Sequence, residues 1–84
     1  MRVGADIRRL TPLHVRLGRT AVGLSVRELA ELAEVAPSTI NRFEVGRGEI
    51  FASTLERIMK VLEDRGVVFI LADATGGPGV RLKG

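Results

Sequence analysis

Residues 24–47 of this 84-residue chain, LSVRELAELAEVAPSTINRFEVGR, contain the strongest structural signal in the sequence. Ser25 stands before an apolar pattern and Glu28 follows three residues later, which is the spacing of a capping box at a helix start. The next apolar residues are spaced as one helical stripe: Leu29, Ala30, Leu32 and Ala33. A first helix with one buried face is therefore predicted to begin after Ser25.

A second helix is predicted within a few residues. Pro37 suits the first turn of a helix, where its missing N–H costs nothing, and Ile40 and Phe43 follow at a spacing of three. Val35 and Ala36 form the uncharged turn between the helices. We expect Val35 to be tucked into the core and Ala36 to be a weak N-cap. Two short helices around such a turn form a helix-turn-helix.

The exposed face of the second helix has an unusual composition. Ser38, Thr39, Asn41 and Arg42 supply short donors and acceptors and one guanidinium, and no carboxylate comes before Glu44. Such a face suits the phosphate-lined groove of DNA. The same polarity also fits an ordinary helical hairpin, so the residue pattern by itself leaves both interpretations open.

The stretch also resembles the phage-repressor-like helix-turn-helix family of the Xre or Cro type. The likeness extends from about Arg16 to near Arg65 and leaves both ends of the chain uncovered. The positions that carry it are Gly23, Leu24, Ser25, Leu29, Ala30, Val35, Ser38, Thr39, Ile40, Phe43, Glu44 and Gly46. The resemblance implies a mainly α fold, a compact repressor-like domain of four or five helices, and the function of a DNA-binding transcriptional regulator.

The resemblance also implies roles for individual residues. Base contacts fall to five positions of the second helix: Pro37, Ser38, Thr39, Asn41 and Arg42. Phosphate contacts fall to Ser25 and Val26 at the start of the first helix, and to Arg47 beyond the second. The family often has Gln where this chain has Val26, and that departure weakens the phosphate anchor. Arg47 would add affinity without specificity.

Arg19 and Glu44 fall where many members of the family join the first and third helices by a largely buried ion pair. Two solvated surface charges are the alternative. A paired Glu44 would explain why a carboxylate is tolerated close to phosphates, and the value of the pair would be geometric more than energetic.

The flanks divide the chain into three parts. Residues 1–10 form a basic arm that either contacts DNA or is a frayed terminus. Residues 11–66 hold the helix-turn-helix domain, whose first helix is capped by Thr11 and opened by Pro12. This helix carries an apolar stripe with four-residue spacing, and Gly23 ends it; the stripe is Leu13, Leu17 and Ala21.

A further helix is predicted after the motif. Ser53 and Glu56 repeat the capping-box spacing at its start, and Gly66 ends it in a left-handed conformation. Its apolar stripe is Leu55, Ile58, Met59 and Leu62.

Residues 67–84 are predicted to be a β-hairpin for dimerisation. Val67–Leu71 is apolar on both faces of a strand, so both faces are expected to be covered. Val80–Leu82 returns after a Gly-rich turn. Because a lone hairpin is marginally stable, we expect two protomers to join their hairpins in a four-stranded sheet. The expected dimer-interface residues are Val67, Val68, Phe69, Ile70, Leu71, Val80 and Leu82.

Composition limits the class of protein. The chain has 13 basic and 10 acidic residues and a net charge of +3, which favours a polyanionic partner. It has no cysteine, which excludes disulfides and thiolate metal sites. No apolar run is long enough to span a bilayer, and the N-terminus does not look like a targeting signal. We therefore expect no membrane partner and a cytoplasmic location, bound to a bacterial or phage nucleoid.

The sequence offers little to catalysis or cofactor binding. His14 is the only histidine, so a metal cluster or a catalytic triad lacks partners, and a surface or satisfied helix position is expected. Glu28, Glu31 and Glu34 lie along one helix rather than across a cleft. The Gly-rich turn after residue 74 lacks the Gly-Lys-Ser/Thr ending of a phosphate loop. No enzymatic activity, metal or cofactor is predicted.

The function predicted from all of this is a homodimeric repressor of a pseudo-palindromic operator, with double-stranded DNA and a second copy as partners. Two alternatives stay open. An antitoxin would use the same helices on its own promoter and cover a toxin with its terminal segment. A protein-interaction or anti-activator module would keep the helical fold, bind another regulatory protein and lack DNA readout.

Overall fold

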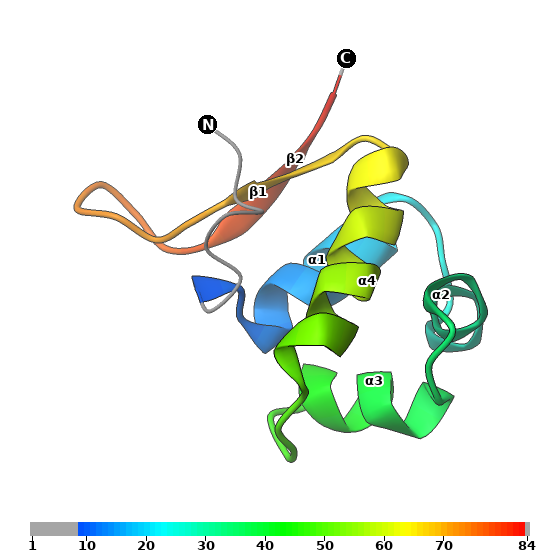
Figure 1. Cartoon of the computed structure of the whole chain (residues 1–84). Coiled ribbons are helices and arrows are strands. Elements are labelled where there is room, and N and C mark those ends of the chain that lie inside the picture. Colours follow the sequence, from blue (N-terminus) through cyan, green and yellow to red (C-terminus); the bar gives the residue numbers. More distant parts are fainter. Residues whose placement is uncertain (1–8, 84) are drawn as a thin grey trace.

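The computed structural model describes residues 9–83, in which four helices are followed by one antiparallel hairpin (Figure 1). The elements are α1 (Pro12–Ala21), α2 (Val26–Ala33), α3 (Pro37–Glu44), α4 (Ala52–Asp64), β1 (Val67–Ile70) and β2 (Gly79–Leu82). The mainly α fold with a C-terminal hairpin is confirmed. The expected arm at residues 1–10 lies outside the described residues except for Arg9 and Leu10. Leu10 is buried in the core rather than part of an arm.

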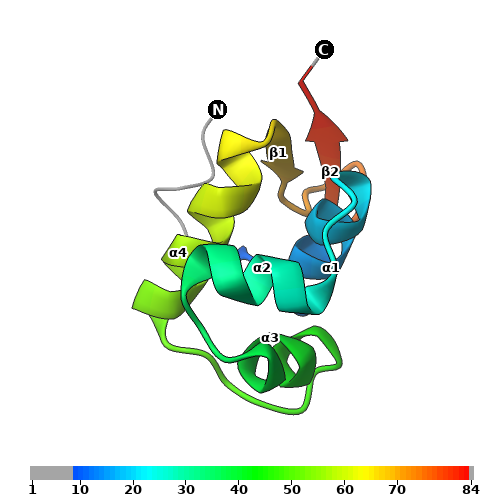
Figure 2. The ribbon, with the colours of Figure 1, turned by 90° about the vertical axis from the view of Figure 1, so that its right-hand side faces the viewer.

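The helices and the sheet are arranged so that α3 and the hairpin lie at opposite ends of the molecule (Figures 1 and 2). The sheet packs on α1 and α4, whereas α3 packs on α1 and α2. Every element contributes to one continuous core, whose most deeply buried side chains are Val15, Leu29, Ile40, Ile58, Leu62 and Val67. The position of α3 is therefore set by the same core that holds the hairpin.

His14 ties the start of α1 to the sheet. Thr11 and His14 form a capping box, in which the Thr11 N–H donates to Nδ1 of His14 at 3.0 Å. Because Nδ1 accepts this bond, the ring proton belongs on Nε2, which donates to the Ile70 carbonyl at 2.7 Å. The ring is fully buried and meets Phe69 edge to face. His14 is thus a satisfied core residue that joins α1 to β1.

The apolar stripe of α1 faces solvent and does not enter the core of the domain. Leu13 and Leu17 are 46% and 36% exposed, and Ala21 is also exposed. The buried residues of the helix are instead His14, Val15 and Gly18. A Cβ on Gly18 would lie 3.2 Å from Leu62 Cδ1 and 3.4 Å from Val67 Cγ1, so the absent side chain lets the core approach the backbone. A pattern of apolar residues does not reveal this buried face, because glycine and histidine do not count as apolar and the outward-facing leucines do.

The capping box predicted at Ser53 is also absent. Helix α4 begins two residues earlier than predicted, with Phe51 rather than Ser53 at the cap position and no side-chain cap bond. The Leu55 N–H donates to the Phe51 carbonyl at 3.0 Å, so Ser53 already lies inside the first helical turn. Because Ser53 already lies within the helix, it is not at the cap position, and the predicted capping box does not form.

The hairpin is covered on one face only, which corrects the expectation of two. Its strands pair with Val67 opposite Leu82 and Phe69 opposite Val80. Val67 and Phe69 face the helices and are 2% and 3% exposed, whereas Ile70 on the other face is 42% exposed. The sheet of the described residues has two strands, and its helices all pack on the same side.

Glu34 carries backbone strain. It ends α2 with a φ of +59°, and it is the one non-glycine residue between 9 and 83 with a positive φ. The conformation lets the Val35 N–H donate to the Ala30 carbonyl at 2.9 Å, as in a Schellman C-cap, which usually uses glycine. The turn of the motif therefore requires a left-handed backbone conformation at Glu34, a residue that disfavours this conformation.

Glu34→Gly should raise the free energy of unfolding by about 0.5–1 kcal/mol, because glycine adopts this conformation without the Cβ clash. Glu31→Gly is the matched control. It lies within the same helix and should lose about 1 kcal/mol. Since the chain has no Trp or Tyr, urea unfolding followed by circular dichroism is the suitable measurement. An equal decrease in the free energy of unfolding of both variants would show that the backbone of Glu34 is not strained.

Candidate nucleic-acid interface

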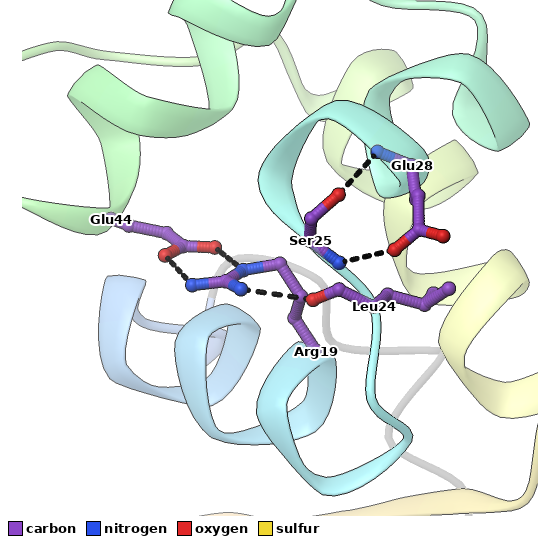
Figure 3. Close-up of polar contacts among 5 residues, drawn as sticks. All are labelled: Arg19, Leu24, Ser25, Glu28 and Glu44. Atoms are coloured by element: carbon purple, nitrogen blue, oxygen red, sulfur yellow. Dashed lines mark hydrogen bonds and ion pairs between the residues drawn. The ribbon is translucent and has the colours of Figure 1, made fainter.

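The start of α2 is fixed by a complete capping box (Figure 3). Ser25 Oγ accepts from the Glu28 N–H at 3.0 Å, and Glu28 Oε1 accepts from the Ser25 N–H at 2.8 Å. The bond that the Ser25 N–H donates to the Glu28 carboxylate, followed by the contribution of the Ser25 hydroxyl, lowers the pKa of Glu28, because it favours the charged form. The cap therefore contributes stability above the ordinary carboxyl pKa of about 4.5 and loses it as pH falls through the lowered value.

The turn between α2 and α3 has the geometry of the motif. Val35 is half-buried and packs against the core, while Ala36 is exposed and makes no side-chain cap bond. Pro37 occupies the first turn of α3, where no N–H is needed. A short turn with an inward Val35 thus orients α3 against the rest of the domain.

Helix α3 presents the predicted polar face to solvent. Ile40 and Phe43 point into the core, at 0% and 9% exposure. The other face carries most of the residues assigned to base contacts. Pro37, Ser38, Asn41 and Arg42 are exposed and Thr39 is half-buried. Ser38, Asn41 and Arg42 share one side because they are three and four residues apart.

The residues assigned to phosphate lie at the two ends of the motif. Ser25 is exposed, but its hydroxyl is already engaged in the capping box. Val26 is half-buried against the core, so it has only its main-chain N–H to offer a phosphate. Arg47 is exposed beyond α3, in the segment that turns at Gly46 with a φ of +74°. The basic side chain is therefore at the far end of the motif.

Arg19 and Glu44 form a two-point ion pair between α1 and the end of α3 (Figure 3). The Arg19 Nε and Nη2 groups donate to the two carboxylate oxygens of Glu44 at 2.8 and 2.9 Å. Nη1 donates to the Leu24 carbonyl at 2.9 Å, which adds the segment before α2 to the same contact. The side chains are only 18% and 5% exposed. The bond to Glu44 raises the pKa of Arg19, so the guanidinium is charged.

The structure divides the seven residues assigned to a dimer interface. Val67 and Phe69 are buried in the core of their own chain and are not free to contact a partner. Val68, Leu71 and Val80 are half-buried. Ile70 and Leu82 are exposed, at 42% and 48%.

Arg57 is a structural residue that the sequence did not reveal. From α4, its Nε donates to the Ala33 carbonyl at the end of α2 at 3.1 Å. The bond satisfies one of the carbonyls that a helix end leaves unpaired. No local pattern signals it, because the two residues are 24 positions apart.

The described part of the chain also bears on membrane and metal binding. No helix within residues 9–83 is long and apolar enough to cross a membrane. No group of three His, Asp or Glu side chains in this range is placed to hold a metal ion.

Comparison with known families identifies the class of the protein. The family model described as helix-turn-helix (HTH_3) matches residues 15–63, which is more than half of the chain and spans α1 to α4. The protein is therefore a DNA-binding helix-turn-helix transcriptional regulator. It belongs to the phage-repressor-like family of the Xre and Cro type. A search of the curated proteins found no match.

Glu44→Ala should lower the free energy of unfolding by about 2–3 kcal/mol, because it leaves the mostly buried Arg19 without its partner. Glu56→Ala removes an exposed carboxylate from α4 and should change stability by less than about 0.5 kcal/mol. The double variant Arg19→Met, Glu44→Leu should recover most of the loss, since no unpaired charge remains. Urea unfolding checks all three, and a negligible effect of Glu44→Ala would show that the pair does not position α3.

Proposed function

We propose that the protein is a sequence-specific repressor that binds a pseudo-palindromic operator as a homodimer. The observation that supports this most is the solvent face of α3. Ser38, Asn41 and Arg42 project from a helix whose opposite face is locked in the core and whose last turn is held by Arg19. A rigid helix with short polar groups and one arginine is suited to the major groove.

Each side chain has a separate task in this proposal. Arg42 is the base reader, because a guanidinium can donate two bonds to the edge of a guanine. Asn41 and Ser38 add shorter contacts beside it, with Pro37 and Thr39 at the start of the helix. Arg47 and the start of α2 at Ser25 and Val26 contact phosphates on either side and set the orientation. Glu44 does not repel the phosphates, because Arg19 neutralises it.

Two copies are needed because one α3 reads only a few base pairs. Two recognition helices in successive major grooves lie about 34 Å apart, so the half-sites should be about ten base pairs apart. Occupation of a promoter by such a dimer would exclude polymerase, which is the simplest form of repression.

Arg42→Ala should cost about 1–3 kcal/mol on operator DNA and reduce the preference over random DNA. Arg47→Ala should weaken both DNAs equally and reduce the slope of log affinity against log salt by about one. Lys60→Ala is the charge-matched control, since Lys60 is 77% exposed on α4 and bonds Asp64. It should leave the preference unchanged.

Fluorescence anisotropy with labelled duplexes at several salt concentrations measures these effects. If Arg42→Ala and Arg47→Ala reduce operator and random binding in the same proportion, the division between base reader and phosphate contact is wrong. If the unaltered protein prefers no sequence, the protein-interaction alternative becomes the better explanation.

A further inference from the structure

Helix α1 has a second apolar face that its own core does not use. Leu13, Leu17 and Ala21 recur every four residues and all are exposed. The three residues lie on one side of the helix, next to the side that packs on the sheet. Both α1 and the four residues of β2 lack acidic side chains. This face is apolar along its length, with Arg16 at its border.

Strand β2 continues this apolar face. It packs beside α1, as the second view shows (Figure 2). Val80 and Leu82 lie opposite the inward-facing Phe69 and Val67, so their side chains are on the helix side of the sheet. Leu82 is nevertheless 48% exposed. We define the α1–β2 flank as Leu13, Leu17, Ala21, Val80 and Leu82.

The outer edge of β2 has main-chain groups available for pairing. The Lys83 N–H donates to the Gly66 carbonyl at 2.8 Å, and bonded pairs alternate along antiparallel strands. Gly79 and Arg81 therefore direct their N–H and carbonyl groups toward β1, whereas Val80 and Leu82 direct theirs outward. Within residues 9–83 no third strand covers this edge.

We infer that a second copy of this chain docks on the α1–β2 flank, with β2 pairing antiparallel to its counterpart and the α1 leucines closing the interface below the joined sheet. This inference rests on the proposed dimeric function and names its surface. In the symmetric register Val80 lies opposite Leu82 of the partner, so the outward groups of both strands are satisfied around a twofold axis.

The area required shows that both elements must take part. A standard stable interface removes about 800 Å² per partner, roughly one seventh of the chain's surface of 5529 Å². The molecule measures 34 × 27 × 20 Å, so an interface of that size has to occupy most of one side. Four strand residues alone would be too few, whereas strand and helix together span the side of the molecule.

The orientation of the flank suits DNA binding. The sheet lies at one end of the molecule and α3 at the other, and α1 lies between them on the same side of the molecule as β2 (Figures 1 and 2). A twofold axis that runs beside this flank, from the sheet end to the α3 end, leaves both α3 helices at the same end. The two recognition helices can then reach one face of a duplex.

The positive charge of Arg81 opposes this arrangement and makes dimerisation depend on salt concentration. In the symmetric register Arg81 lies opposite Arg81 of the partner, on the face of the sheet away from the helices. Salt screens repulsion between like charges, so dimerisation should strengthen as salt rises. An acidic partner protein on the same basic-rimmed flank would bind more weakly as salt rises.

Sedimentation equilibrium at micromolar concentration tests the surface. The hairpin cannot simply be deleted, because Val67 and Phe69 belong to the core. Leu13→Glu and Leu17→Glu should instead give monomers with an unchanged circular dichroism spectrum. Each would raise the dimer dissociation constant by at least about 100-fold, because a carboxylate would be buried unpaired. Leu32→Glu is the control, since Leu32 on α2 is as exposed as Leu13, at 46%, and should remain dimeric.

Arg81→Glu gives a second test. Mixed with the unaltered protein, it should form heterodimers in excess of the statistical half, because Arg81 then faces a carboxylate. The inference would be overturned if the unaltered protein were monomeric, or if both α1 variants still formed dimers. It would also be overturned by a statistical mixture of Arg81→Glu with the unaltered protein, or by dimers that weaken as salt rises.

Binding to a duplex with one half-site separates this inference from the proposed function. The monomeric Leu17→Glu should bind a half-site as the unaltered protein does and lose the tighter binding to the full operator. A dimer that follows all the predictions above but prefers no DNA sequence would reject the repressor proposal and leave the surface in place.

Discussion

The contact between Arg19 and Glu44 is the constraint on which the interface depends. Helix α3 has only eight residues, and it packs mainly through Ile40 and Phe43. Its last turn is held by a two-point ion pair to α1, and the third guanidinium nitrogen holds the Leu24 carbonyl before α2. One side chain thus fixes the three segments that must keep their relative positions for α3 to be presented to a groove. Because it is mostly buried, its value lies in geometry more than in net stability.

A second set of contacts joins the hairpin to the helices. The His14 ring bonds Thr11 on one side and the Ile70 carbonyl on the other, and Gly18 lets Leu62 and Val67 approach α1. The hairpin is therefore part of the domain's core and not an appended segment. This explains why its inner residues are unavailable to a partner, and why the free edge of β2 and the outer leucines of α1 remain as the surface for a second copy.

The sequence predicted the features that depend on residues close together in the chain. The caps at Thr11 and Ser25, the prolines that open α1 and α3, and the left-handed end at Gly66 each depend on neighbours a few residues away. The predictions that the structure did not confirm concern helix faces and helix starts. The apolar stripe of α1 gives no sign that His14 and Gly18 are buried, because their partners are in α4 and β1. Helix α4 starts from a cap position at Phe51, two residues before Ser53, so the predicted capping box does not form.

The residues of the candidate DNA interface could also be predicted where they depend on local sequence, but not where they depend on distant contacts. Periodicity alone places Ile40 and Phe43 inward and Ser38, Asn41 and Arg42 outward. The partnership of Arg19 with Glu44 came only from the family resemblance, since the two residues are 25 positions apart. The contact from Arg57 to Ala33 had no signal at all. The assignment of individual side chains to bases and phosphates stays a prediction, because neither the fold nor the family match includes DNA.

Selection of bound sequences from a random duplex library, followed by affinity measurements of the selected site against salt, is the decisive test of sequence-specific repression. A homodimeric repressor should enrich an inverted repeat with half-sites about ten base pairs apart, and its binding should fall steeply with salt. Weak binding with no enriched sequence would contradict it.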